Sequence, residues 1–137
     1  MSTLKVNNLQ DINGANNSTP EEVAQGRAKA WVHFNGTFSS STTLTTGNGG
    51  IYDSYNVTSV TDVNTGRYNV NMSITMPNIN YAVVCDGRRN TNDEPNTVHV
   101  TTRRTAFTTT RFGVRSSAGL SNDFVDSEFV CAVVFGD

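Results

Sequence analysis

The side chains able to carry out chemistry are few and lie far apart along the chain. The two histidines, His33 and His99, have no Cys, His or Asp neighbours at a spacing typical of a metal site. The two cysteines, Cys85 and Cys131, are not part of a CxxC motif. The sequence therefore predicts neither a metal ion nor a cofactor.

Both cysteines lie in apolar segments that are typical of strand cores, where a thiol behaves as a small buried hydrophobe. The N-terminus has no basic region followed by an apolar one, so we expect no secretory signal. Chains without such a signal mature in a reducing compartment, which favours free thiols and synthesis in the cytoplasm. No run approaches the roughly 18 apolar residues of a membrane span, so no membrane insertion is expected.

The motifs of hydrolases and phosphate-binding enzymes are missing. No GxSxG elbow occurs, and the glycine-rich residues 47–50 lack the Lys-Ser/Thr that makes a phosphate loop. Asp123 with Asp126, or Asp93 with Glu94, would suit a glycosidase such as a capsule depolymerase. That chemistry requires a cleft walled by aromatic rings, and the aromatic residues look scattered. We interpret these acids as solvated loop charges and predict that the protein is not an enzyme.

Arginine outnumbers lysine by eight to two, and four arginines form the pairs 88–89 and 103–104. Guanidinium groups suit planar contacts with carboxylates at an interface or on an acidic sugar. We favour the interpretation that these arginines pair with nearby acids such as Asp86, Asp93 and Glu94 and protect edge strands. A role in receptor contact is the alternative.

The composition makes nucleic acid an improbable partner. Charged residues make up 16% of the 137 residues, against about 25% in average globular chains, and Asn, Ser and Thr supply about a third. The net charge is only −2, so there is no strong positive field to attract a polynucleotide.

The elements that must position these residues begin with an arm. The first 18 residues carry too little apolar surface to fold alone and predict an extended arm that lies on something else. Its apolar residues are Leu4, Val6, Leu9 and Ile12.

A short helix follows the arm. Thr19 and Glu22 form a capping box, Pro20 occupies the first helical position, and Gly26 ends the helix after less than about two turns. Because so short a helix is unstable alone, Val23 must pack against the domain or against other copies.

From residue 28 the apolar period changes to two, as in strands. Ala28, Ala30, Val32 and Phe34 share one face, and Trp31 with His33 lies on the other. Trp31 is either a core residue of a second face or a residue buried between subunits, and we favour the second because the polar chain has little core to absorb it.

The rest of the chain reads as short strands. Residues 37–50 predict an exposed loop or weak hairpin, and residues 56–62 and 67–75 predict a hairpin that turns at Gly66. The arginine- and threonine-rich residues 98–104 and 107–115 predict outer or edge strands.

The last strand, residues 126–136, is apolar on both faces and should lie in the middle of a sheet packed on both sides. We predict an all-β fold, an antiparallel β-sandwich of about seven or eight strands over residues 28–137, preceded by the arm and helix at residues 1–27.

Several segments together carry a family resemblance. They are residues 26–37 (GRAKAWVHFNGT), 54–57 (SYNV), 60–62 (VTD), 66–70 (GRYNV) and 76–83 (MPNINYAV), with the opening 3–7 (TLKVN) and the closing 128–136 (EFVCAVVFG). In this order they resemble the tail-fibre C-terminal domain of tailed bacteriophages, common in marine and cyanobacterial viruses. The resemblance covers nearly the whole chain, although residues 37–50 look longer than the family's link.

The resemblance implies a homotrimeric virion protein, a short tail fibre or fibre tip that takes part in host-surface attachment. Because Met1 lies almost at the domain, we expect the arm to join other tail or virion proteins. The neck and trimer residues are then Leu4, Val6, Leu9, Ile12, Val23 and Trp31.

The receptor, a host-surface glycan, would meet loops 37–50, 87–96 and 116–123 at the far end. The side chains expected to contact it are Tyr52, Arg88, Arg89 and Asp93. A non-catalytic carbohydrate-binding module is the alternative function; it would be a monomer with an aromatic platform.

Overall fold

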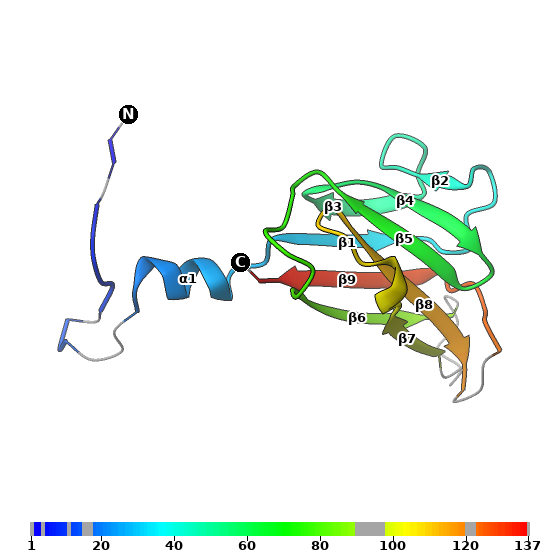
Figure 1. The fold of residues 1–137 in the computed structure, drawn as a ribbon. Coiled ribbons are helices and arrows are strands. Elements are labelled where there is room, and N and C mark those ends of the chain that lie inside the picture. Colours follow the sequence, from blue (N-terminus) through cyan, green and yellow to red (C-terminus); the bar gives the residue numbers. More distant parts are fainter. Residues whose placement is uncertain are drawn as a thin grey trace.

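The computed structural model describes residues 2–3, 5–10, 12–14, 18–89, 98–119 and 123–136, and it confirms the predicted antiparallel β-sandwich (Figure 1). One sheet has the order β3 (Ile51–Tyr55), β1 (Ala30–Phe34), β9 (Phe129–Phe135) and β6 (Ala82–Arg88). The other has the order β2 (Thr43–Leu44), β4 (Val57–Asn64), β5 (Arg67–Met72), β8 (Arg111–Ala118) and β7 (Val98–Thr102). The helical elements are α1 (Pro20–Gly26) and the 3-10 turn η1 (Arg104–Ala106).

The two sheets enclose one continuous hydrophobic core. Strand alternation supplies it: β1 buries its first, third and fifth residues, and β5 buries its second, fourth and sixth. The largest fully buried side chains are Tyr68, Phe34 and Phe112. The expectation that this polar chain has little core of its own is therefore wrong for the sandwich, because strict alternation turns its modest apolar content inward.

The hairpin predicted around Gly66 is confirmed, since β4 and β5 pair and Gly66 takes a left-handed φ of 61°. Residues 37–50 contain the short β2 and bury Leu44, with Phe38 packed against the core. Strand β7 lies at a sheet edge as predicted.

Strand β8 differs from its prediction: it begins at Arg111 and lies between β5 and β7, inside the sheet. Residues 107–110 do not continue it, because Thr108 and Arg111 form a tight reversal there.

Strand β9 is central in its sheet, as its apolar sequence predicts, but only one of its faces is covered within this chain. Val130, Ala132 and Val134 are buried, whereas Phe129 and Phe135 are half-exposed on the other face. Cys131 is exposed there too, so its expected burial is wrong. Cys85 alternates onto the inner side of β6, where its thiol approaches Val100 O at 3.6 Å, and both cysteines are free.

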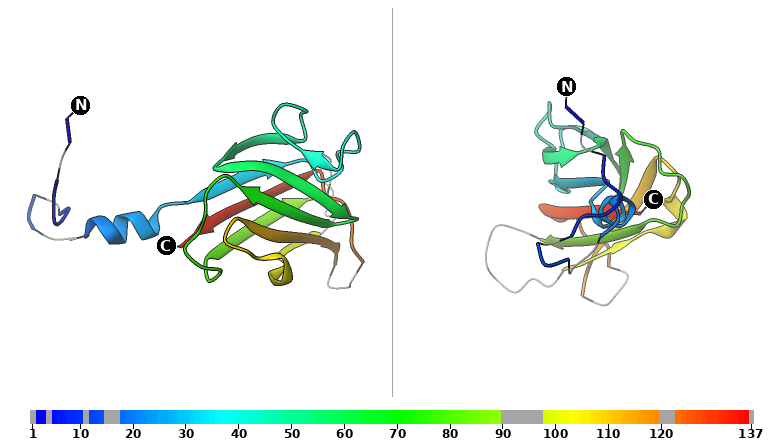
Figure 2. Two further views of the ribbon diagram at one scale, coloured as in Figure 1. Left: turned by 45° about the horizontal axis from the view of Figure 1, so that its top comes forward. Right: turned by 90° about the vertical axis from the view of Figure 1, so that its left-hand side faces the viewer.

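The arm and α1 project from one end of the sandwich, along the direction of the strands (Figure 2). We call this end proximal and the opposite end distal. The capping box is present: Glu22 N donates to Thr19 Oγ1 and Thr19 N donates to Glu22 Oε2. The arm is not extended throughout, since Leu9 and Ser18 exchange two backbone hydrogen bonds and the chain doubles back.

A hydrogen-bonded lock joins the two sheets at the distal end. Asp126 Oδ1 accepts from Tyr68 Oη at 2.8 Å and from Gly66 N at 2.7 Å, and the buried Ser116 and Ser127 hydroxyls lie 2.5 Å apart. Asp126 is therefore a structural residue and not the solvated loop charge that the sequence suggested. The lock gives the distal end a rigid base.

Asp62 weakens this end at neutral pH. Burial raises the pKa of its carboxyl and the charge of Asp126 raises it further, and Asp62 Oδ1 is buried without a hydrogen-bond partner among the described residues. The folded state binds the proton more tightly than the unfolded state, so stability falls as pH rises from the ordinary aspartate pKa of 3.8 through the raised pKa of the folded state.

We expect Asp62→Asn to raise the free energy of unfolding at pH 7 by about 0.5 kcal/mol, a value discounted because the site is partly solvated. The gain should vanish near pH 3, where the Asp62 carboxyl is protonated in both the folded and the unfolded state. Urea unfolding across pH measures it, with the exposed Asp53→Asn as the control. If the Asp62→Asn variant and the wild type are equally stable at every pH, the expectation is wrong.

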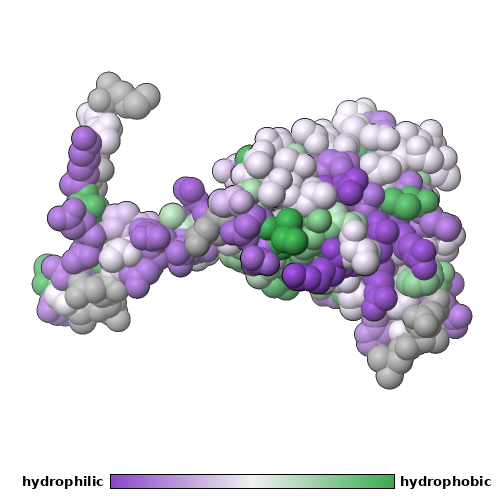
Figure 3. All heavy atoms as spheres, in the orientation of Figure 1, coloured by the Kyte–Doolittle hydropathy of each residue, from purple (hydrophilic) through white to green (hydrophobic). Residues whose placement is uncertain are grey.

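The outer surfaces of the two sheets differ in character. The outer face of the five-stranded sheet is largely hydrophilic over β5 and β8 (Figure 3). The outer face of the four-stranded sheet carries exposed apolar side chains, among them Tyr55 and Val84.

Candidate functional site

The connections predicted to meet a ligand fall at one end of the molecule. Strands β1, β6 and β8 run toward the distal end, and the segments that follow them begin there. The described parts of loops 37–50, 87–96 and 116–123 therefore gather opposite α1, as Figure 1 shows. Residues 90–97 and 120–122 lie outside the described part of the chain.

Four side chains form a stripe across the distal part of the four-stranded sheet, one from each strand. They are Tyr52 (β3), His33 (β1), Phe129 (β9) and Arg88 (β6), which we call the distal stripe. The His33 ring lies 4.8 Å from Tyr52 and 5.8 Å from Phe129, between centroids. The Arg88 guanidinium lies 4.9 Å from the Phe129 centroid.

A register shift in β3 exposes Tyr52. His33 pairs with Asp53 but Phe34 pairs with Ile51, so Tyr52 is the extra residue of a bulge. Ile51 still points into the core, while Tyr52 and Asp53 are both exposed. Burial raises the pKa of the Tyr52 hydroxyl, and the charge of Glu128 raises it further, so the phenol is neutral at neutral pH and can donate a hydrogen bond.

The distal stripe offers flat rings flanked by one cation. Aromatic faces pack against the C–H groups of a sugar ring, and Arg88 can donate to hydroxyl or carboxylate oxygens. The arrangement suits binding of a saccharide.

One register step toward α1, the polar residues Asp53, His33, Cys131 and Asp86 follow one another across the sheet. Burial raises the pKa of the Cys131 thiol, and the charge of Asp86 raises it further. A thiol with a raised pKa is a poor nucleophile. Within the described residues, no group of three or more His, Cys, Asp or Glu side chains could hold a metal ion.

The next row is apolar across all four strands. Trp31 pairs with Tyr55 on one side and with Val133 on the other, and Val133 pairs with Val84. Tyr55 is 51% and Val84 62% exposed, and Phe135 continues the row toward the proximal end. We call Trp31, Tyr55, Val84, Val133 and Phe135 the apolar face. Trp31 is not a core residue, because β1 turns it away from the other sheet.

The arm and helix carry further exposed apolar side chains. Val6, Leu9 and Val23 are each more than a third exposed, and Ile12 is fully exposed. Helix α1 has no buried residue. Leu4 lies outside the described residues.

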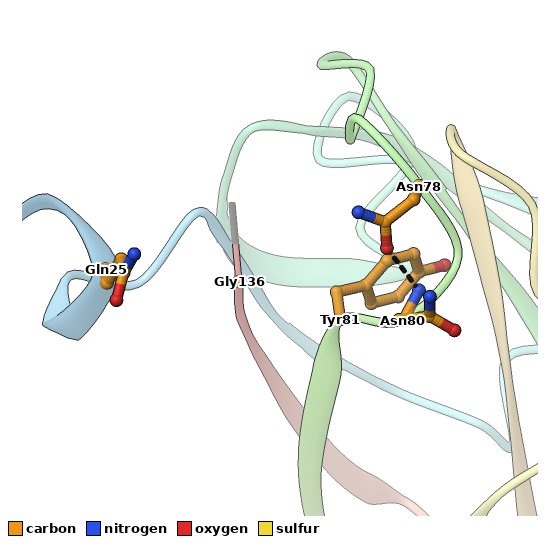
Figure 4. A pocket seen from close by; sticks show the side chains of 5 residues that line it. All are labelled: Gln25, Asn78, Asn80, Tyr81 and Gly136. Atoms are coloured by element: carbon orange, nitrogen blue, oxygen red, sulfur yellow. Dashed lines mark hydrogen bonds between the residues drawn. The ribbon is translucent and has the colours of Figure 1, made fainter. Parts of the chain in front are cut away.

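A polar hollow of about 320 Å³ lies between the end of α1 and the sandwich, lined by Gln25, Asn78, Asn80, Tyr81 and Gly136 (Figure 4). Asn80 N donates to Asn78 Oδ1, and the Tyr81 hydroxyl turns inward to share its proton between Thr108 O and Arg111 O. Burial raises the pKa of Tyr81 to about 12. The described residues of its lining include amides but no carboxylate or histidine, and that lining does not suit acid–base chemistry.

Of the predicted receptor residues, Tyr52 and Arg88 meet on Phe129, Arg89 is exposed beside them, and Asp93 lies outside the described residues. The view that the aromatic residues are scattered is wrong here. Sequence reasoning missed Phe129 and His33. Their outward position follows from strand alternation, but their contact depends on which strands are neighbours.

Within the described part of the chain, Arg103 of the second arginine pair donates to Asn69 of β5, and Arg104 is exposed in η1. Asp93 and Glu94, two of the acids predicted to pair with these arginines, lie outside that part.

No protein-family model matches this chain, and neither a curated protein nor a solved structure matches it significantly. Among the described residues, no helix has the length and apolar character needed to cross a membrane.

Proposed function

We propose that this protein is a homotrimeric virion protein of a tailed bacteriophage, a short tail fibre or fibre tip that attaches to a host-surface glycan. The observation that carries the proposal is the difference between the two ends of the molecule. The arm and α1, with their exposed apolar side chains, are at the proximal end, and the distal stripe and the loops are at the distal end. The family resemblance of the sequence supports the same function.

The neck supports the oligomer. A seven-residue helix with no buried residue gains its capping box but little packing from the described part of its own chain. Three copies around a threefold axis would pack Val23 of each helix against the others, and the arm would bring in Leu9 and Ile12. Ile12 is also exposed enough to meet another virion protein.

The apolar face continues this interface. It begins where α1 leaves the sandwich, so copies joined at their helices bring their proximal rows together. Trp31 at its centre is the residue type that most often dominates binding energy at interfaces. The same contact would cover the second face of β9, whose apolar sequence calls for packing on both sides.

The distal stripe favours one alternative, a non-catalytic carbohydrate-binding module. Such a module would use the same rings but would have no need of the neck. Its expected state is a monomer at all concentrations.

Deleting residues 1–18 tests the proposal. The sandwich core lies wholly within residues 30–134, so the truncated chain should fold. We expect sedimentation to show at least tenfold weaker trimerisation and virion assembly to incorporate no truncated protein. Normal incorporation would remove the arm from the attachment role, and a monomeric full-length chain would favour the alternative.

A second variant tests the receptor site by combining Phe129→Ala with Arg88→Ala in the distal stripe. This variant should remain trimeric and enter particles but lose its glycan-array signal. Val63→Ala, at an exposed position beside the β4–β5 turn and outside both surfaces, should change neither property. An unchanged glycan signal in the stripe variant would reject the stripe as the receptor site.

A further inference from the structure

The outer face of the five-stranded sheet gathers four arginines. Arg67 in β5 and Arg111 and Arg115 in β8 alternate with core residues and therefore point outward. Arg103 joins them from the segment after β7. Among the described residues, none of the four forms an ion pair with a carboxylate.

Gly113 makes the room for Arg103. The backbone N of Arg103 donates to Gly113 O at 2.7 Å, and its guanidinium reaches across β8 to donate to Asn69 Oδ1 on β5. A Cβ at Gly113 would lie 3.0 Å from Arg103 Cβ and 2.7 Å from Ala106 Cβ. A side chain at that position would displace Arg103, so the glycine places a cation in the middle of the face.

The positive charges lie close together at a cost in stability. Arg67 and Arg115 are direct cross-strand partners, an arrangement that is unfavourable for like charges. Burial lowers the pKa of Arg103, and the charges of Arg67 and Arg111 lower it further. The chain as a whole has a net charge of −2, so the positive charge is concentrated locally on this face.

The arginines have neutral partners. The Arg67 guanidinium lies 4.2 Å from the Phe124 ring centroid, and Arg115 Nε donates to Thr101 Oγ1 at 2.8 Å. Arg111 Nε donates to Ala106 O at 3.3 Å. Each guanidinium has five N–H donors, so donors remain for an oxyanion.

We propose that Arg67, Arg103, Arg111 and Arg115, the arginine face, bind an anionic polysaccharide through its carboxylate or sulfate groups. A polysaccharide fits better than a nucleic acid for two reasons. Four arginines on a chain of net negative charge suit the spaced charges of an acidic polysaccharide better than the closely spaced phosphates of a polynucleotide. Phe124 is the aromatic ring found against these arginines and Arg67 lies over it, so it offers no open stacking surface for a base.

This site goes beyond the attachment function proposed above, since it lies on the opposite sheet from the distal stripe. Its polar neighbours suit sugar hydroxyls: Asn71 Nδ2 already donates to Ser59 Oγ and Thr61 Oγ1 on the same face. A polymer bound here would run along the side of the protein, not across its tip.

Titration of the full chain with dextran sulfate, alginate and neutral dextran of equal length tests the proposal. Wild type should bind one or both anionic polymers and not dextran; dextran sulfate reports on sulfate and alginate on carboxylate. Arg67→Gln with Arg115→Gln should weaken binding at least tenfold, and Arg103→Gln or Arg111→Gln alone about threefold or more. Lys5→Gln with Arg27→Gln removes the same charge far from the face and should leave binding unchanged.

The melting temperature distinguishes the loss of a binding site from the loss of a structural contact. Relieving the Arg67–Arg115 repulsion should leave the melting temperature of the double variant unchanged or raised while its affinity falls. A lower melting temperature with unchanged affinity would overturn the proposal. So would equal binding of double-stranded DNA of matched charge.

A failure of the arginine-face proposal can be distinguished from a failure of the attachment function. Phe129→Ala should bind dextran sulfate as wild type does, and a loss there would move the site to the distal stripe and overturn this proposal. A chain that is monomeric and inactive on the glycan array but still binds through Arg67 and Arg115 would reject the attachment function alone.

Discussion

Trp31→Ser combined with Val84→Thr should dissociate the proposed trimer without unfolding the sandwich. Both side chains point away from the core, so the change leaves the core packing intact and removes contacts of the proposed interface. Loss of a central tryptophan contact costs about 2–4 kcal/mol, which corresponds to a 30- to 1,000-fold weaker association. Sedimentation at micromolar concentration should then show a monomer whose melting temperature no longer depends on protein concentration.

Trp31 also reports on its own surroundings, because it is the chain's one tryptophan. Its emission should shift to the red when the wild-type protein is diluted below the dissociation constant. Val63→Thr makes the same valine change at a position 47% exposed in the distal β4–β5 turn, and it should leave the trimer intact. A double variant that still sediments as a trimer would exclude the apolar face as the interface.

Local pattern in the sequence predicted much of the sandwich. Alternation placed Val32 inside and Trp31 outside, the capping box marked the start of α1, and Gly66 marked the hairpin. These features depend on neighbours within a few residues. The prediction for β8 failed because its threonines and arginines suggest an edge, whereas pairing with β7 covers that side.

The candidate sites were harder to predict because they join distant segments. The distal stripe brings residues 33, 52, 88 and 129 together through the strand order of one sheet, with a bulge that turns Tyr52 outward. The arginine face depends on Arg103 crossing Gly113 to reach β5. Neither the strand order nor that crossing is encoded in any short stretch of sequence.

Gly66→Ala should destabilise the sandwich by about 3–4 kcal/mol, a large part of the 5–15 kcal/mol typical of a domain. The left-handed φ accounts for about 1 kcal/mol. The remainder follows from contact, because a Cβ there would lie 2.4 Å from Ser116 O and 2.8 Å from Val125 O. Those are backbone atoms, which cannot rotate away as a side chain would.

Gly49→Ala separates the two contributions in urea unfolding. Gly49 has a φ of 81°, and beyond its chain neighbours no described residue has an atom within 4 Å of its ideal Cβ, so its substitution should cost only the conformational part, about 1 kcal/mol. Equal costs at the two positions would contradict the contact argument. Gly66 N also donates to Asp126, three residues before β9 begins at Phe129. A displaced turn should therefore shift Phe129 as well, so Gly66→Ala should also weaken glycan binding.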